Sequence, residues 1–191
     1  NTISAGDAWL VLYAFSIQIY GDFSGYTDMA LAIAALFGVS LPENFRSPYM
    51  SLSIRDFWTR WHMTLSRWLR DYLYIPLGGS RRGISGTILA VMTTMLLGGL
   101  WHGASWTFIV WGALHGLFIV IERIIGVERS PIVKFQWIRR LLVFHFVAFA
   151  WIFFRTPSFD RGIELFYSFS IPKDISFLTS APLIPILVLA T

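Results

Sequence analysis

Apolar and polar residues are gathered into long alternating stretches along this 191-residue chain. Residues 83–100, 105–121 and 138–154 are mostly apolar, and a helix needs about 20 such residues to cross a bilayer. Arginines flank the outer ends of the first two stretches. Because cytoplasmic loops carry excess positive charge, we predict a hairpin whose tip lies away from the cytoplasm. The pattern as a whole predicts an all-α, multipass integral membrane protein.

Two shorter apolar segments, residues 8–20 and 27–41, precede these stretches. The glycines and the acid of residues 21–26 predict a turn between them. At a rise of about 1.5 Å per residue, neither segment alone easily crosses a hydrocarbon core of about 30 Å. Residues 156–181 are more polar and contain proline, which predicts an external loop. We expect residues 1–191 to form one membrane domain, the C-terminal portion of a longer protein whose N-terminal helices are missing here.

Residues 43–82 form a basic segment, with seven arginines against three acidic residues. Its large apolar residues recur at the spacing of one helix face: Phe57, Trp61, Leu65, Trp68 and Tyr72. Arg60 and Arg67 lie off this face. The spacing predicts one basic amphipathic helix, and such a helix with tryptophan on its apolar side lies well in a lipid headgroup layer at the cytoplasmic surface. An ordinary solvated helix packed on its own protein is the alternative.

The composition agrees with a membrane protein. Hydrophobic residues make up 55% of the chain and charged residues only 14%, whereas about a quarter of a soluble domain is charged. The net charge of +4 comes almost wholly from arginine, and its placement indicates membrane topology rather than nucleic-acid binding. The absence of cysteine excludes disulfides and a cysteine nucleophile. Four scattered histidines without metal-ligand spacing indicate no structural metal.

His102 is the strongest candidate for chemistry. It lies in the apolar sequence LGGLWHGASW, where the surroundings penalise a charged imidazolium and so leave a proton acceptor at neutral pH. The neighbouring Gly103 allows a backbone or a ligand to approach closely. The alternative is a packing histidine bonded to a nearby carbonyl. His115 and His145 are more typical of packing residues, and His62 is either an interfacial histidine or part of the mouth of a site.

Two carboxylates, Asp22 and Asp28, lie near the predicted turn of residues 21–26. Acidic residues at membrane depth are usually functional, although one of them could instead cap the following helix. Together with the histidines they could also form the proton relay of a transporter.

Three long stretches carry a resemblance to a known family. The first is QIYGDFSGYTDMALAIAALFG at residues 18–38. The second runs from PENF at residues 42–45 through RDFWTRWHMTLSRWLRDYLYIPLGGSRRG at residues 55–83, and the third is GGLWHGASWTFIVWGALHG at residues 98–116. They resemble the membrane-bound O-acyltransferase family, and more narrowly its bacterial branch that acts in alginate O-acetylation and in D-alanyl transfer to teichoic acid. The resemblance covers residues 15–123.

The resemblance implies an enzyme of the plasma (inner) membrane that passes an acyl group to a hydroxyl of an extracytoplasmic polymer. The donor would be acetyl-CoA or an acyl-carrier thioester, used as substrate, with no tightly bound cofactor. The expected acceptor is an exopolysaccharide such as alginate, reached directly or through an extracytoplasmic acetyltransferase partner. D-Alanyl transfer from a carrier protein and a non-catalytic scaffold that anchors a periplasmic transferase are the alternatives, beside the transporter.

The resemblance also assigns roles to residues. The family's essential histidine in its WHG motif falls on His102, a general base or proton relay. Its second histidine falls on His62, in RWHMTLS, where Thr64 replaces a serine and keeps the hydroxyl; it would position or polarise the thioester. We further expect substrate contacts from the following residues: Trp101, Gly103, Asp22, Arg60 and Arg67, the two arginines facing an anionic donor.

Overall fold

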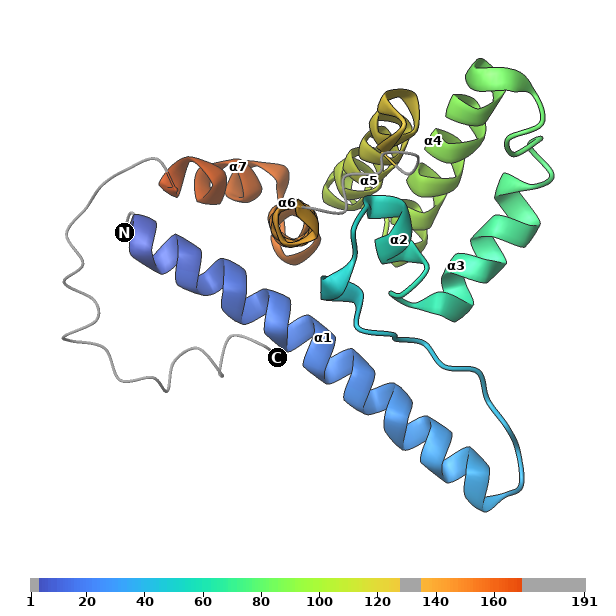
Figure 1. The fold of residues 1–191 in the computed structure, drawn as a ribbon. Helices are drawn as coiled ribbons and strands as arrows, with labels where there is room; N and C mark the ends of the chain where they lie inside the picture. Colours follow the sequence, from blue (N-terminus) through green and yellow to red (C-terminus); the bar gives the residue numbers. More distant parts are fainter. Residues whose placement is uncertain (1–3, 128–134, 170–191) are drawn as a thin grey trace.

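The computed structural model describes residues 4–127 and 135–169, and these are helical with short connections. In chain order the elements are α1 (Ala5–Leu36), the 3₁₀ turn η1 (Pro48–Met50), α2 (Ile54–Trp58), α3 (Met63–Leu69), the π-helical η2 (Arg70–Tyr74), α4 (Gly83–His102), α5 (Trp106–Ile125), α6 (Gln136–Arg155) and α7 (Phe159–Ser168). Figure 1 shows their arrangement. No strand occurs within the described residues, so the predicted all-α class is confirmed.

Among the described residues, the three helices long and apolar enough to cross a membrane are α4, α5 and α6, each of 20 residues. They coincide with the three predicted spans. α4 and α5 lie side by side and are joined by a short turn (Figure 1), which confirms the helical hairpin, while the side of the membrane on which its tip lies stays a prediction. A non-polar bilayer requires every backbone N–H and C=O to be bonded within the segment, so apolar stretches of this length become helices.

Glycines bring α4 and α5 close together. A Cβ at Gly99 would collide with the carbonyl oxygen of Phe108, and a Cβ at Gly112 would collide with that of Met95. The backbones therefore meet at a point that only glycine permits, as small residues do between membrane helices generally. This contact fixes the end of α4, where His102 lies.

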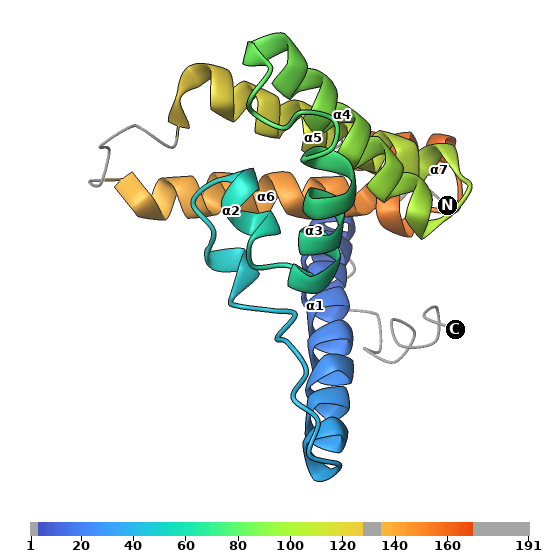
Figure 2. The same ribbon diagram turned by 90° about the vertical axis from the view of Figure 1, so that its right-hand side faces the viewer.

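The prediction of two helices separated by a turn at residues 21–26 is wrong, because α1 is continuous through it. The hydroxyl of Thr27 donates to the carbonyl oxygen of Ser24 at 2.9 Å, so these polar side chains bond back onto the helix rather than ending it. With 32 residues, α1 is about 48 Å long. Figure 2 shows it running across the direction of α6 and extending beyond the other helices.

The prediction of one continuous amphipathic helix along Phe57–Tyr72 is also wrong. α2 ends at Trp58, and α3 begins only at Met63, after His62 with φ of 43°. Two backbone bonds hold this break against an earlier loop: the Arg46 N–H donates to the Arg60 carbonyl, and the Met63 N–H donates to the Asn44 carbonyl. Tertiary contacts therefore override the local helical pattern.

The break lets the aromatic side chains of this segment enter the core. Phe57 and Trp61 pack with their rings stacked at 5.6 Å, and Trp61 reaches Trp151 of α6 at 5.1 Å. The external loop predicted at residues 156–181 contains α7, whose first turn is capped by the Ser158 hydroxyl accepting from the Arg161 N–H. The part of that prediction beyond residue 169 lies outside the described residues.

Candidate active site

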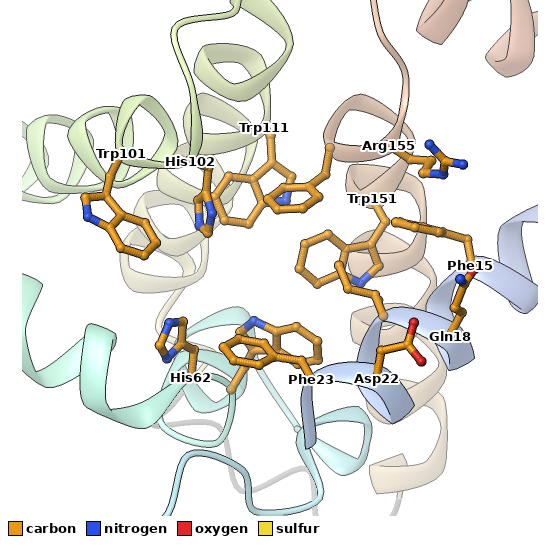
Figure 3. Close-up of a pocket in the computed structure, with 13 residues that line it drawn as sticks. Phe15, Gln18, Asp22, Phe23, His62, Trp101, His102, Trp111, Trp151 and Arg155 are labelled. Atoms are coloured by element: carbon orange, nitrogen blue, oxygen red, sulfur yellow. The ribbon is translucent and has the colours of Figure 1, made fainter. Parts of the chain in front are cut away.

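A cavity of about 620 Å³ lies where α1, the break before α3, and the ends of α4 and α6 come together (Figure 3). Its lining is mainly aromatic, with a few polar side chains: Phe15, Gln18, Ile19, Asp22, Phe23, Trp61, His62, Trp101, His102, Trp111, Trp151, Phe154 and Arg155. Its size and its mostly apolar walls are those of a small-molecule site.

His102 is the last residue of α4 and is enclosed by aromatic rings. Trp101, Trp111 and Phe154 meet its ring edge to face, with centroids 5.0, 5.3 and 5.0 Å away. Within the described part of the chain, no residue forms a hydrogen bond with either ring nitrogen, and the side chain is half-buried. The ring is thus held in place by packing while its nitrogens remain available to a substrate.

His62 enters the cavity from the opposite side, and Figure 3 shows the two imidazoles facing each other. His62 has a positive φ and precedes the first residue of α3, so it lies at the break in the helix that the sequence predicted there. Phe23 of α1 meets its ring at 4.8 Å. Trp101 lies beside both histidines, with centroids 6.4 Å from His62 and 5.0 Å from His102.

Asn44 fixes the tautomer of His62. The Thr64 N–H and the Thr64 hydroxyl both point to Asn44 Oδ1, at 3.3 and 2.6 Å, so this atom must be the amide oxygen. The same oxygen lies 3.3 Å from His62 Nδ1. Because an amide oxygen only accepts, Nδ1 carries the proton and donates, which leaves Nε2 as a proton acceptor.

The surroundings keep His62 neutral. Burial lowers its pKa from the ordinary 6.5 to about 4, and the repulsion that would arise if His102 were protonated as well is the second cause. A neutral imidazole with a free acceptor nitrogen suits hydrogen bonding to a substrate or proton transfer near neutral pH.

Two of the five expected substrate contacts lie at this cavity. Asp22 and Trp101 line it. Gly103 follows His102 but is covered by the Phe108 ring, which lies 2.6 Å from where its Cβ would be. Arg60 instead pairs with Asp56 at 2.8 Å.

Arg67 lies outside the histidine cavity. It donates to the carbonyl oxygens of Met63 and Glu43 and lines a second cavity. The structure therefore brings Asp22 and Trp101 to the two histidines, but not the two arginines.

The other two histidines do not line this cavity and form hydrogen bonds within the protein, and their packing roles stay a prediction. His115 is fully buried in α5, where its Nδ1 accepts from Trp58 Nε1 at 3.3 Å. His145 donates from Nδ1 to the Leu141 carbonyl at 2.7 Å, and its Nε2 accepts from the Tyr13 hydroxyl at 2.9 Å.

Sequence reasoning missed several residues of the site. Trp111 forms the wall behind His102, and Trp151 and Phe154 of α6 complete it. The two α6 residues lie outside the three motif stretches, and no spacing signal marked them. Asn44 lies in a stretch that carries the family resemblance, but sequence reasoning gave it no role in the site. Among the described residues, no group of three histidine or acidic side chains could hold a metal ion.

Three helices long and apolar enough to cross a membrane, beside a cavity lined by two histidines, are the features of a helical membrane protein. Residues 7–159 match the model of the membrane-bound O-acyltransferase family. The chain belongs to this family.

Similarity to curated proteins supports the same family assignment. The chain is 49% identical over 163 residues to the Pseudomonas putida protein named probable alginate O-acetylase AlgI, covering 85% of this chain and 33% of that protein. It is 42% identical over 167 residues to the Helicobacter pylori peptidoglycan O-acetyltransferase, covering 86% and 32%. It is 30% identical over 154 residues to the Streptococcus thermophilus teichoic acid D-alanyltransferase, covering 70% and 37%. The chain thus spans about a third of the length of these relatives.

Proposed function

We propose that this chain carries the acyl-transfer site of a membrane-bound O-acyltransferase, which passes acetyl groups from a thioester donor for the O-acetylation of an exopolysaccharide such as alginate. The observation that carries the proposal is the cavity in which His62 and His102 face each other between aromatic walls (Figure 3). Such walls hold a reactive acyl group away from bulk water, which limits its hydrolysis.

His102 acts as the general base in this proposal. Its ring nitrogens face substrate rather than protein, so one of them takes the proton of the attacking hydroxyl. The hydroxyl oxygen attacks the thioester carbonyl carbon, the new ester C–O bond forms, and the C–S bond breaks. The leaving sulfur takes up the proton that His102 had accepted, which restores the neutral imidazole.

His62 positions the reactants. With Nδ1 donating to Asn44, neutral His62 offers Nε2 as an acceptor and can hold a substrate O–H or N–H. Polarising the thioester carbonyl would require its protonated form, which the lowered pKa of His62 disfavours near neutral pH. Asp22 accepts hydrogen bonds from acceptor hydroxyls, and Trp101 flanks both imidazoles with an apolar surface.

The remaining parts of the proposal concern the whole protein. The donor is acetyl-CoA or an acyl-carrier thioester, consumed as a substrate. The protein is a multipass protein of the bacterial inner membrane, and the acetyl group reaches the polymer directly or through an extracytoplasmic acetyltransferase partner. The two relatives named for O-acetyl transfer are more similar to this chain than the D-alanyltransferase is, which favours acetyl over D-alanyl as the acyl group.

The test is the acetyl content of secreted polysaccharide from cells that express the full-length protein with His102→Ala at wild-type level. We expect the acetyl esters to be lost. The matched control is His145→Gln, since His145 packs against Tyr13 and does not line the cavity; acetylation should persist. Normal acetylation with His102→Ala would remove this residue from the mechanism. Alkaline hydrolysis that releases D-alanine instead of acetate would reassign the acyl group.

A further inference from the structure

A second cavity lies between α2, α3 and η2 on one side and α4 and α5 on the other. Its volume is about 380 Å³, which is within the range of about 300–1,000 Å³ of ligand pockets. It shares no lining residue with the histidine cavity.

Four exposed arginines stand around this cavity: Arg55, Arg67, Arg70 and Arg123. The described lining contains no carboxylate. Of the neighbouring acids, Asp71 pairs with Arg70 at 2.7 Å, and the Glu122 carboxylate accepts the Ile54 N–H at 2.9 Å. The rim therefore has an excess of positive charge and attracts an anion.

The interior of the cavity is apolar. Leu69, Val91 and Met95 are buried there, and Ile119 lies one turn before Arg123 on α5. α5 is long and apolar enough to cross a membrane, and Arg123 is in its last turn. We therefore place the arginines at the membrane surface and Ile119 about 6 Å deeper. Trp58 and Tyr74 also line the cavity, and such residues favour the membrane–water interface.

We propose that this cavity binds an anionic membrane phospholipid, with its phosphate at Arg67 and Arg123 and an acyl chain against Val91, Met95 and Ile119. A charged rim above an apolar interior matches a molecule with an anionic head and a long hydrocarbon chain. The acetyl donor would enter with a polar pantetheine arm and a two-carbon acyl group, which match this apolar interior less well than a hydrocarbon chain does. The lipid site lies beyond the acyl-transfer reaction and does not depend on it.

The experiment measures lipid binding to the purified full-length protein in detergent by native mass spectrometry. The probes are dioleoyl phosphatidylglycerol and dioleoyl phosphatidylcholine, which differ in net charge but not in acyl chains. We expect the anionic lipid to bind more tightly. Each arginine near such a lipid contributes about fivefold, so Arg67→Gln with Arg123→Gln should weaken its binding about 25-fold and leave the zwitterionic lipid unaffected.

The control pair is Arg46→Gln with Arg161→Gln. Both residues are exposed and lie outside the cavity, so their replacement should leave binding unchanged. Val91→Phe provides an independent variant, because it fills the apolar part without altering charge and should weaken binding of both lipids.

Two outcomes overturn the proposal: equal binding of the two lipids, or displacement of phosphatidylglycerol by micromolar acetyl-CoA, which would assign the cavity to the donor. His102→Ala should bind the lipid like the wild type. Loss of acetylation with normal lipid binding, or the reverse, therefore separates the two proposals.

Discussion

Replacing Asn44 by Asp adds a negative charge beside His62 while keeping an acceptor for its Nδ1–H and for Thr64. In the native protein the His62 pKa lies near 4, so lowering the pH from 8 to about 5 should leave His62 neutral and functional. An adjacent carboxylate favours the protonated imidazolium, so the Asn44→Asp variant should lose the neutral form at higher pH.

The separation sets the size of the effect. The amide oxygen lies 3.3 Å from Nδ1. At this distance and an effective dielectric constant of about 20, two unit charges attract by about 5 kcal/mol. Because His62 is only half-buried, solvent screening reduces this upper bound. We therefore expect the acid limb of the activity profile to move upward by about 1 to 3 pH units, as carboxylate–cation pairs usually do.

The assay is the pH dependence of acetyl transfer by full-length protein in proteoliposomes, compared among wild type, Asn44→Asp and Ser80→Asp. The last variant adds the same charge at an exposed position away from the histidine cavity and should keep the wild-type profile. Adding His62→Gln to Asn44→Asp should abolish the shift. An unchanged acid limb in Asn44→Asp would refute the bond between Asn44 and His62 or the role of neutral His62 in the reaction.

The remaining predictions concern the helices that hold the site. Gly112→Ala should lower the stability of the detergent-solubilised protein by about 3 kcal/mol or more, because its Cβ meets the Met95 backbone, whereas a Cβ at Gly98 meets only a movable Leu69 methyl. Thermal unfolding compares Gly112→Ala with Gly98→Ala, and equal melting temperatures would contradict the tight helix crossing. Glu122→Ala should cost about 1 to 3 kcal/mol, because its carboxylate accepts backbone N–H groups at the start of α2. Hydrogen exchange that leaves α2 as protected as in the wild type would argue against this bond.

The amino-acid sequence was sufficient for the membrane helices. Three apolar stretches became α4, α5 and α6, because a helix in a bilayer satisfies its own backbone hydrogen bonds and needs no distant partner. The same sequence patterns identified the two histidines, since each lies in a long motif that could be compared with a known family.

Two predictions from local patterns were wrong, for different reasons. Glycine and serine at residues 21–26 predicted a turn, but α1 continues because its side chains bond to the preceding turn of the helix. The apolar stripe from Phe57 to Tyr72 predicted one helix, but backbone bonds to the loop at Asn44 and Arg46 break it at His62. The spacing of apolar residues predicts which face of a helix is apolar. It does not predict which distant loop will pack against that helix.

The sequence by itself thus determined the class of fold and the three helices long enough to span a membrane, and it singled out His62 and His102 as candidate site residues. Only the tertiary structure decided that these two imidazoles face each other, that Asn44 fixes the tautomer of one of them, and that Arg67 belongs to a separate cavity. The physical reason is that hydrophobicity and helix propensity act over a few neighbouring residues. A site is assembled by packing between segments far apart in the chain, and one helix break or one glycine contact determines which side chains meet.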